Sequence, residues 1–304
     1  MSKDYILVTG ATGFIGKSII ENYKHCRMVI RNKSSKKLSK NNSFLINNLD
    51  GTTSWEGAFH NINTIIHLAG LAHVNTFSKE NYWSTNVDGT LRLAKQASLN
   101  GVKRFVFVSS IGVNGTSTYD KPFSPESEPT PHNMYASSKY IAELGLQKIS
   151  EETGLEIVIV RPTLVYGPDA PGSFGYLSNL VKYSPCLPFG AINNKRSFIS
   201  VQNLADLLIT CATHSNAPGN TFLASDCKSV SIKKFTNGIA KGLGTNLVQL
   251  PVPVNLIRLA GNFLGKSAMV EQMVGNLEVD STNLKTILDW TPPYTLEESM
   301  AFLK

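Results

Sequence analysis

Tyr135 and Lys139 are the two residues of this sequence whose types and spacing point most directly to chemistry. A separation of four residues places both side chains on one face of a helix, about 5–6 Å apart. A nearby ammonium favours a phenolate, so we expect Lys139 to pull the pKa of Tyr135 below its ordinary value of about 10. Tyr135 could then act as a general acid or base. Because such a pair also occurs by chance in many helices, its weight depends on the motifs around it.

Two serines follow an apolar run that we expect to be a strand, Arg104–Val108. In open sheets flanked by helices, ligands bind outside the carboxyl ends of the strands, and Ser110 falls there. We expect the Ser110 hydroxyl to hydrogen-bond a carbonyl that is being reduced or formed. Simple capping of the next turn is the alternative role, which we assign to Ser109.

A glycine-rich segment, Val8–Gly16, joins the first expected strand to the first expected helix. Its glycines recur at every third residue, Gly10, Gly13 and Gly16. Glycine permits a tight turn and lets a pyrophosphate approach backbone N–H groups at a helix N-terminus. A glycine triplet alone is an ordinary turn, but the strand before it and the helix after it predict a bound dinucleotide.

The residues after the second expected strand indicate which dinucleotide binds. An NAD site places a carboxylate about 20 residues after the glycine loop, whereas a 2′-phosphate is met by an arginine. Arg31 occupies that place, and no Asp or Glu lies between Glu21 and Asp50. We therefore favour NADP(H), with NAD(H) possible, and expect most of the other cations here to form a solvated loop. The cations of this window are Lys24, Arg27, Arg31, Lys33, Lys36, Lys37 and Lys40.

Short apolar, β-branched runs alternate with helical patterns along the first half of the chain, which predicts a doubly wound α/β fold with a parallel sheet. The helical segments are about Phe14–His25 and Asn133–Thr153. The expected strands are Tyr5–Val8, Arg27–Ile30, Phe44–Leu49, Thr64–Leu68, Arg104–Val108 and Glu156–Val160.

The second half predicts a smaller, mostly helical substrate lobe. Residues 167–190 are rich in Gly, Pro and Ser, so we expect a partly irregular segment that lines the cleft. Ser197–Val201 and Thr221–Ala224 resemble strands, Asn203–Ala212 a helix, and the chain ends in further helices. We thus expect a dinucleotide domain at 1–166, to which 197–225 returns, and a substrate lobe at 167–196 and 226–304. The expected terminal helices are Ser231–Gly242, Val254–Leu264 and Leu296–Leu303.

Composition limits the remaining classes. A net charge of +7 suits either nucleic acid or small anions, but no nucleic-acid-binding motif is present. Cys26, Cys186, Cys211 and Cys227 lack metal-site spacing, so we expect reduced thiols and no metal. With no apolar stretch near 18 residues and no basic n-region at the start, we expect a cytoplasmic protein without membrane insertion.

With these residues in hand, the sequence resembles the extended short-chain dehydrogenase/reductases, the nucleotide-sugar epimerase/dehydratase family, over essentially its whole length. The resemblance implies a Rossmann fold and a homodimer formed through paired helices. The segments that carry it are TGATGFIG (9–16), HLAG (67–70), NVDGT (86–90), SSIGVNG (109–115), YASSK (135–139), RPTLVYGP (161–168) and RSFISVQNLADLL (196–208).

The resemblance also implies roles for individual residues. Ser110, Tyr135 and Lys139 would be catalytic; Tyr135 and Lys139 would also contact the cofactor, Lys139 at the nicotinamide ribose. Ser110 would contact the substrate too, and Arg196 would grip the diphosphate of a UDP-sugar, for which a guanidinium is suited. The other residues implied to bind or support the cofactor are Gly10, Thr12, Gly13, Phe14, Ile15, Gly16, Arg31, Asn48, Leu49, Leu68, Ala69, Gly70, Asn86 and Pro162.

Three positions depart from the family pattern: Asn48 replaces an acidic adenine contact, Leu164 replaces an asparagine common in epimerases, and Asn114 replaces a tyrosine. Through SSIGVNG (109–115), LPFGAINNKRS (187–197) and WTPP (290–293), the sequence resembles bacterial reductases that make UDP-N-acetylquinovosamine from UDP-4-keto-6-deoxy-N-acetylglucosamine for surface polysaccharides. This implies NADPH-dependent 4-keto reduction. The alternatives are an NAD-dependent UDP-hexose 4-epimerase and a non-catalytic NADP-sensing regulator.

Overall fold

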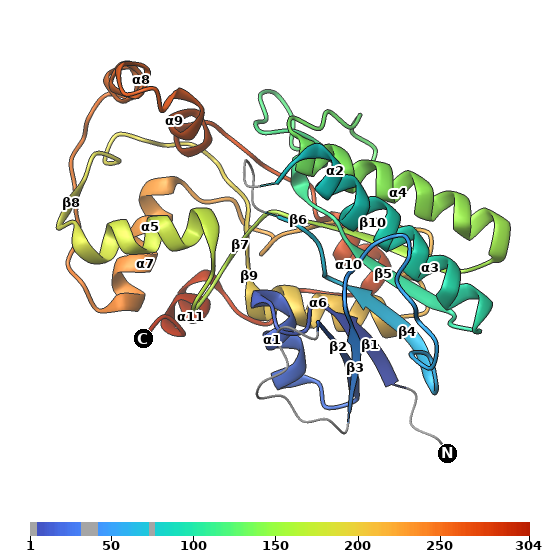
Figure 1. The fold of residues 1–304 in the computed structure, drawn as a ribbon. Coiled ribbons are helices and arrows are strands. Elements are labelled where there is room, and N and C mark those ends of the chain that lie inside the picture. Colours follow the sequence, from blue (N-terminus) through green and yellow to red (C-terminus); the bar gives the residue numbers. More distant parts are fainter. Residues whose placement is uncertain (1–4, 32–41, 73–76) are drawn as a thin grey trace.

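The computed structural model describes residues 5–31, 42–72 and 77–304. Its centre is a seven-stranded sheet in the order β10-β6-β5-β4-β1-β2-β3, in which every pairing is parallel (Figure 1). The doubly wound α/β fold predicted from the sequence is confirmed. The strands of this sheet are β1 (Tyr5–Thr9), β2 (Cys26–Arg31), β3 (Ser43–Ile46), β4 (Ile62–His67), β5 (Arg104–Val108), β6 (Glu156–Pro162) and β10 (Thr221–Ala224).

Alternate residues of the strands enter two separate apolar cores. On β1, Ile6 and Val8 face one core, whereas Leu7 faces the other. This alternation follows from the two-residue period of a strand, and both sides must be apolar because helices cover both faces. Helices α1 (Phe14–Asn22) and α6 (Val201–Thr213) lie over one face of the sheet, and α3 (Gly89–Leu99) and α4 (Met134–Thr153) over the other (Figure 1).

Most helices of the first half precede or follow strands of the main sheet. The Asn133 side chain caps the longest of them, α4, by accepting from Ala136 N at 2.8 Å. The elements are α1 (Phe14–Asn22), α2 (Lys79–Tyr82), the π-helical turn η3 (Trp83–Asp88), α3 (Gly89–Leu99), the 3-10 turn η4 (Ile111–Val113) and α4 (Met134–Thr153).

Two predicted elements end earlier than we expected. The strand predicted to reach Leu49 ends at Ile46, because Asn48 to Thr53 fold into a turn in which the Thr53 hydroxyl donates to Asn48 O at 3.0 Å. The helix predicted to reach His25 ends at Asn22, and the next residue, Tyr23, is extended.

The second half of the chain adds two small parallel sheets and seven helices. β7 (Leu164–Tyr166) pairs with β9 (Phe198–Ser200), and β8 (Cys186–Leu187) pairs with β11 (Val248–Gln249). The helices, of which the sequence had not indicated α5, α9 and α10, are α5 (Gly172–Tyr183), α6 (Val201–Thr213), α7 (Ile232–Leu243), α8 (Val254–Phe263), α9 (Ser267–Val274), α10 (Thr282–Leu288) and α11 (Leu296–Ala301).

Two expectations for this half are wrong in part. The segment expected to be irregular contains the three-turn helix α5, because Phe174, Leu177 and Val181 bury one helical stripe despite the glycines around them. The strand expected at Ser197–Val201 exists as β9, but it pairs with β7 outside the main sheet. Only β10 of the returning segment lies in the main sheet.

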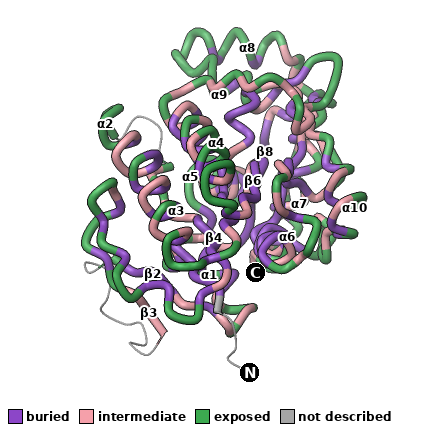
Figure 2. The backbone as a smooth tube through the Cα atoms, turned by 90° about the vertical axis from the view of Figure 1, so that its right-hand side faces the viewer, coloured by how far each residue is buried: buried purple, intermediate pink, exposed green. Residues whose placement is uncertain are grey.

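A third apolar core holds the C-terminal helices together. The rings of Phe198 and Phe235 stack with centroids 3.8 Å apart, and Tyr166 meets Phe235 edge to face at 5.3 Å. The buried stretches in Figure 2 follow the sheet and this core, whereas α8 at the periphery is mostly exposed. The division into a domain at 1–166 with 197–225, and a lobe at 167–196 and 226–304, remains a prediction.

Candidate active site at the carboxyl edge of the sheet

The glycine loop between β1 and α1 is shaped by close backbone contacts. Gly10 has φ +70°, and a Cβ there would lie 2.9 Å from Ala69 N. A Cβ at Gly16 would collide with Gly10 O and with Ala11. The loop therefore packs directly on Leu68 and Ala69, which follow β4, and it requires glycine at both positions.

The N-terminus of α1 is open to an anion. Gly13 is the N-cap residue, so no side chain caps the first turn of α1, and Thr12 and Gly13 are exposed. Free N–H groups and the helix dipole favour a pyrophosphate at this position. Phe14 and Ile15 are half-buried, and Phe14 contacts the C-terminal part of the chain near Gly167. The cradle fits a dinucleotide.

The buried side chain of His67 supports the glycine loop, a role that the sequence analysis did not predict. The His67 ring nitrogens lie 2.7 Å from Thr9 Oγ1 and 2.9 Å from Thr90 Oγ1, and Ala69 N donates to Thr9 Oγ1 at 3.2 Å. Burial, and then the charge of Lys139, lower the pKa of His67 to about 3. His67 is therefore a neutral hydrogen-bonding link between β1, β4 and α3.

Arg31 is the last residue of β2 and is exposed, opposite Ile46 in the register of β3. Among the described residues it forms no ion pair. Asn48 is exposed and Leu49 buried just beyond β3. The cations Lys33, Lys36, Lys37 and Lys40, which strengthened the sequence argument, lie outside the described residues.

The Lys139 ammonium is buried at the end of β5. Its Nζ donates to Val108 O at 2.8 Å and lies 4.6 Å from the centroid of the Phe107 ring. A Cβ at Gly70 would lie 3.4 Å from Nζ, so the loop after β4 passes directly over it. Burial lowers the pKa of Lys139 to about 8, although the carboxylate of Glu143 acts in the opposite direction.

Tyr135 differs from our expectation. Its pKa is raised to about 12, mainly by burial and to a smaller extent by the nearby Tyr82, while a hydrogen bond with Ser110 acts in the opposite direction. The expected depression by Lys139 is therefore wrong for this structure, because the Lys139 ammonium is directed at Val108 O rather than at the phenol. The ring of Tyr82, a residue not singled out from the sequence, lies 6.5 Å from that of Tyr135.

Ser110 also accepts from Gly112 N at 3.1 Å and so caps the turn η4. Ser109, to which we had assigned this capping, has instead a buried hydroxyl without a hydrogen-bond partner among the described residues. That assignment is wrong, because the backbone turns after Ser110.

Asn86 joins the loop after β4 to α4. Its amide accepts from Leu71 N at 2.8 Å and donates to Leu71 O and to Ser138 Oγ, each at 3.0 Å. Ser138 in turn donates to Tyr135 O. Asn86 lies in the π-helical turn η3, a geometry that is frequent at functional sites. The structure thus brings Ser110, Tyr135, Lys139, Asn86 and Gly70 together.

A buried ionic network beside these residues was also missed. Arg161 on β6 donates to both carboxylate oxygens of Glu143 on α4, at 3.0 and 2.6 Å, and to Asn114 Oδ1 at 3.0 Å. All three side chains are buried. Asn114 stands at the position where the family resemblance implies a tyrosine. Its side chain accepts from the buried Arg161 and is therefore part of the core.

Arg196 lies apart from this group, in the C-terminal part of the chain. Its guanidinium is half-buried and donates to Gly275 O at 3.0 Å, while its backbone bridges Val230 and Leu277. Burial lowers its pKa to about 10, so it is a cation at neutral pH. No carboxylate pairs with it among the described residues. Pro162 is buried at the end of β6, next to Ala224.

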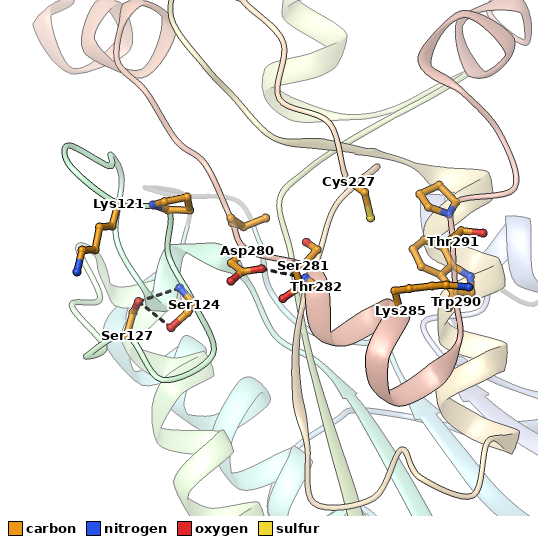
Figure 3. A pocket seen from close by; sticks show the side chains of 13 residues that line it. Lys121, Ser124, Ser127, Cys227, Asp280, Ser281, Thr282, Lys285, Trp290 and Thr291 are labelled. Carbon is orange, nitrogen blue, oxygen red and sulfur yellow. Dashed lines mark hydrogen bonds between the residues drawn. The ribbon is translucent and has the colours of Figure 1, made fainter.

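A cavity of roughly 740 Å³ opens elsewhere, between residues 121–127 and 279–292 (Figure 3). Cys227, Ser281 and Trp290 are among its lining side chains, but none of the predicted site residues is. Within the described ranges, no group of three or more His, Cys, Asp or Glu could hold a metal ion, and no helix is long and apolar enough to cross a membrane.

Three comparisons agree with this geometry. The model of the NAD dependent epimerase/dehydratase family matches residues 6–224. A UDP-glucose 4-epimerase of Vibrio cholerae is 37% identical over 302 residues, covering 96% of this chain and 92% of the relative.

Two solved structures share the fold. The UDP-glucose 4-epimerase of Thermotoga maritima with UDP-glucose has a TM-score of 0.75 at 20% identity, covering 98% of this chain and 97% of that one. RMD of Pseudomonas aeruginosa complexed with NADPH has a TM-score of 0.74 at 20% identity, covering 99% and 98%.

The buried ammonium of Lys139 makes stability depend on pH. Its pKa of about 8 is below the ordinary 10.5, so between these values the unfolded chain holds a proton that the folded protein has released. The free energy of unfolding must therefore rise with pH through this window. We expect it to rise by ~1–3 kcal/mol more in the wild type than in Lys139→Met between about pH 8 and 10. Urea unfolding at several pH values measures this free energy in both proteins. If it changed equally with pH in the wild type and in Lys139→Met, the assignment would be contradicted.

The Arg161–Glu143 pair gives a second test. Arg161→Met leaves a buried carboxylate without its partner, and we expect it to lower the free energy of unfolding by ~3–5 kcal/mol. The double variant Arg161→Met/Glu143→Met removes both charges and should recover most of this loss. Denaturant unfolding of the three proteins measures the coupling, and equal losses in the single and double variants would refute it.

Proposed function

Because the chain belongs to the NAD dependent epimerase/dehydratase family, we propose that it is an NADPH-dependent 4-ketoreductase of a UDP-4-keto-6-deoxy-hexose. Membership confirms the resemblance to extended short-chain dehydrogenase/reductases, and the chain is an NAD(P)-dependent enzyme of the nucleotide-sugar epimerase/dehydratase type. The proposed substrate is UDP-4-keto-6-deoxy-N-acetylglucosamine. The product would be UDP-N-acetylquinovosamine, a precursor for surface polysaccharides.

The observation that carries this proposal is Arg31 at the end of β2. A carboxylate there would bind the ribose 2′-hydroxyl of NAD and repel a 2′-phosphate. Arg31 is instead exposed and free of ion pairs among the described residues, so it is available to a phosphate. NADPH suits a net reductase, which must exchange its cofactor after each turnover. An epimerase returns the hydride to its substrate and keeps its NAD bound.

The state of Tyr135 also supports reduction. A phenol with a pKa of about 12 holds its proton throughout the neutral range and is ready to donate it.

The catalytic residues would act together at C4 of the sugar. When bound, the reduced nicotinamide supplies the hydride to this carbon. Ser110 would orient the C4 carbonyl, and Tyr135 would donate its proton to the C4 oxygen, which completes the alcohol. Lys139 would bind the nicotinamide ribose and sustain the proton supply from solvent to the phenolate left behind.

Arg196 would bind the diphosphate of the UDP-sugar. It is a half-buried cation without a carboxylate partner in the described part of the chain, and a bidentate guanidinium suits phosphate. Asn48 and Leu49 at the adenine, Leu68 and Ala69 along the cofactor, and Pro162 remain predictions.

A UDP-hexose 4-epimerase is the second candidate, because the Vibrio cholerae relative bears that name. It would use the same three residues with retained NAD. A non-catalytic NADP sensor has less support, since it has no chemical need for Ser110, Tyr135 and Lys139.

The deciding assay follows cofactor absorbance with UDP-4-keto-6-deoxy-N-acetylglucosamine, generated in place by a dehydratase. We expect NADPH to be oxidised faster than NADH. Absence of oxidation, with NAD-dependent interconversion of a UDP-hexose and its C4 epimer, would establish the second candidate instead.

Two variants, Tyr135→Phe and Arg31→Ala, test whether the activity depends on the proposed site, and Tyr119→Phe is the control. Tyr135→Phe removes the donated proton and should reduce kcat by about 10²-fold or more, whereas Tyr119→Phe, at an exposed tyrosine, should not change it. Arg31→Ala should raise the KM for NADPH and leave that for NADH nearly unchanged.

We further propose a homodimer in the cytoplasm. Helices α3 and α4 lie side by side, with Leu91 against Gly145, and Ile141 and Leu144 remain partly exposed on α4. Two such faces could pair into a four-helix interface. Light scattering should give twice the chain mass, and the mass should fall to that of one chain in Leu144→Glu.

A further inference from the structure

The His132 side chain lies beside Ser110, although the sequence analysis did not single it out. A Cβ on Gly112 would lie 3.3 Å from Ser110 Oγ and also 3.3 Å from His132 Cε1, so no more than twice this distance separates these two atoms. The imidazole thus occupies space that Gly112 leaves beside the Ser110 hydroxyl. Because Ser110 also hydrogen-bonds Tyr135, His132 borders the two groups that we expect to face the reacting carbon.

The Asn133 side chain determines which nitrogen of the His132 ring can donate. Asn133 Oδ1 accepts from Ala136 N at 2.8 Å as the cap of α4, which turns Asn133 Nδ2 toward the ring. Nδ2 lies 2.8 Å from His132 Nε2, and an amide nitrogen of this kind only donates, so Nε2 is the acceptor. In the neutral imidazole the proton is then on Nδ1. Nδ1 has no hydrogen-bond partner within the described residues, so this donor is available to a ligand.

The position and exposure of His132 favour a contact with the substrate over a structural role. His132 is exposed, whereas Asn86 and Lys139, which support the site from within, are buried. The cap of α4 needs only the Asn133 side chain, so the imidazole is not required to hold the helix. An exposed N–H donor at the carboxyl edge of the sheet, next to a hydroxyl that orients a carbonyl, suits another oxygen of the molecule that carries this carbonyl.

We propose that His132 is a specificity-determining residue, which donates from Nδ1 to a hydroxyl of the hexose ring. The proposal rests on the nucleotide-sugar site of the proposed function and adds a contact that holds the sugar rather than the nucleotide. Because Ser110 meets the C4 oxygen, His132 recognises the part of the ring next to the reacting carbon. It takes no part in the transfer of the hydride or of the proton.

Calorimetric titration of the purified full-length protein with two ligands tests the proposal. UDP-N-acetylglucosamine carries a hexose and UDP does not, so loss of a contact with the sugar weakens binding of the first ligand alone. The variant His132→Phe keeps a flat ring over Gly112 but has no N–H donor. We expect its affinity for UDP-N-acetylglucosamine to fall on the order of tenfold and its affinity for UDP to equal that of the wild type.

Two further variants separate the lost hydrogen bond from other effects. His132→Asn keeps an N–H donor near the position of Nδ1 and should recover part of the loss. The matched control is His60→Phe, which makes the same substitution at an exposed histidine before β4 and should bind both ligands like the wild type.

Three results would overturn the proposal. Equal affinities of the wild type and His132→Phe for UDP-N-acetylglucosamine would show that the sugar is held without His132. An equal loss for UDP and for the nucleotide sugar would show that the substitution disturbs the whole site, and a wild type that binds neither ligand would remove the basis for the contact. The titrations do not involve NADPH oxidation, so the contrast between the two ligands can persist where the reductase assay fails, and it can be absent in an active reductase.

Discussion

The burial of one ammonium group determines how the candidate active site is assembled. Lys139 can remain charged inside the protein only if its Nζ finds acceptors, and it finds Val108 O at 2.8 Å and the face of the Phe107 ring. These contacts tie α4 to the carboxyl end of β5. Tyr135, one turn earlier on α4, is thereby held beside Ser110, and Gly70 must lack a side chain for the neighbouring loop to pass.

Two arginines, Arg161 and Arg196, differ in the partners that their guanidinium groups have. Arg161 is buried, and its guanidinium donates three hydrogen bonds, two to Glu143 and one to Asn114. Arg196 is half-buried, and its guanidinium donates to the Gly275 carbonyl but pairs with no carboxylate in the described residues. A buried charge without a partner is costly, so a paired arginine fits a structural role and an unpaired one fits an anionic ligand.

The C-terminal helices carry apolar side chains both on their inner side and on their outer side. Their inner side chains form the aromatic core around Phe235, which fixes the strand pair β7 and β9 beside the main sheet. That packing holds Arg196 just before β9. The outer side of the same helices presents Phe263 and Leu259 to solvent. One small core thus supports both a candidate phosphate contact and an exposed apolar surface.

The sequence by itself determined the features that depend on neighbours along the chain. Apolar runs predicted the parallel sheet, the spacing of Gly10, Gly13 and Gly16 predicted the loop before α1, and the spacing of Tyr135 and Lys139 placed them on one helix. Each of these follows from local periodicity or from the conformational range of glycine.

Tertiary structure decided what depends on distant segments. The pKa of Tyr135 rises because the surrounding protein removes water from the phenol and because the phenol of Tyr82 lies nearby, neither of which the Tyr135–Lys139 spacing could reveal. Arg161 finds Asn114 across 47 residues, and β9 pairs with β7 rather than joining the main sheet. Burial and long-range pairing arise only when separate segments pack, and no local pattern records which segments will meet.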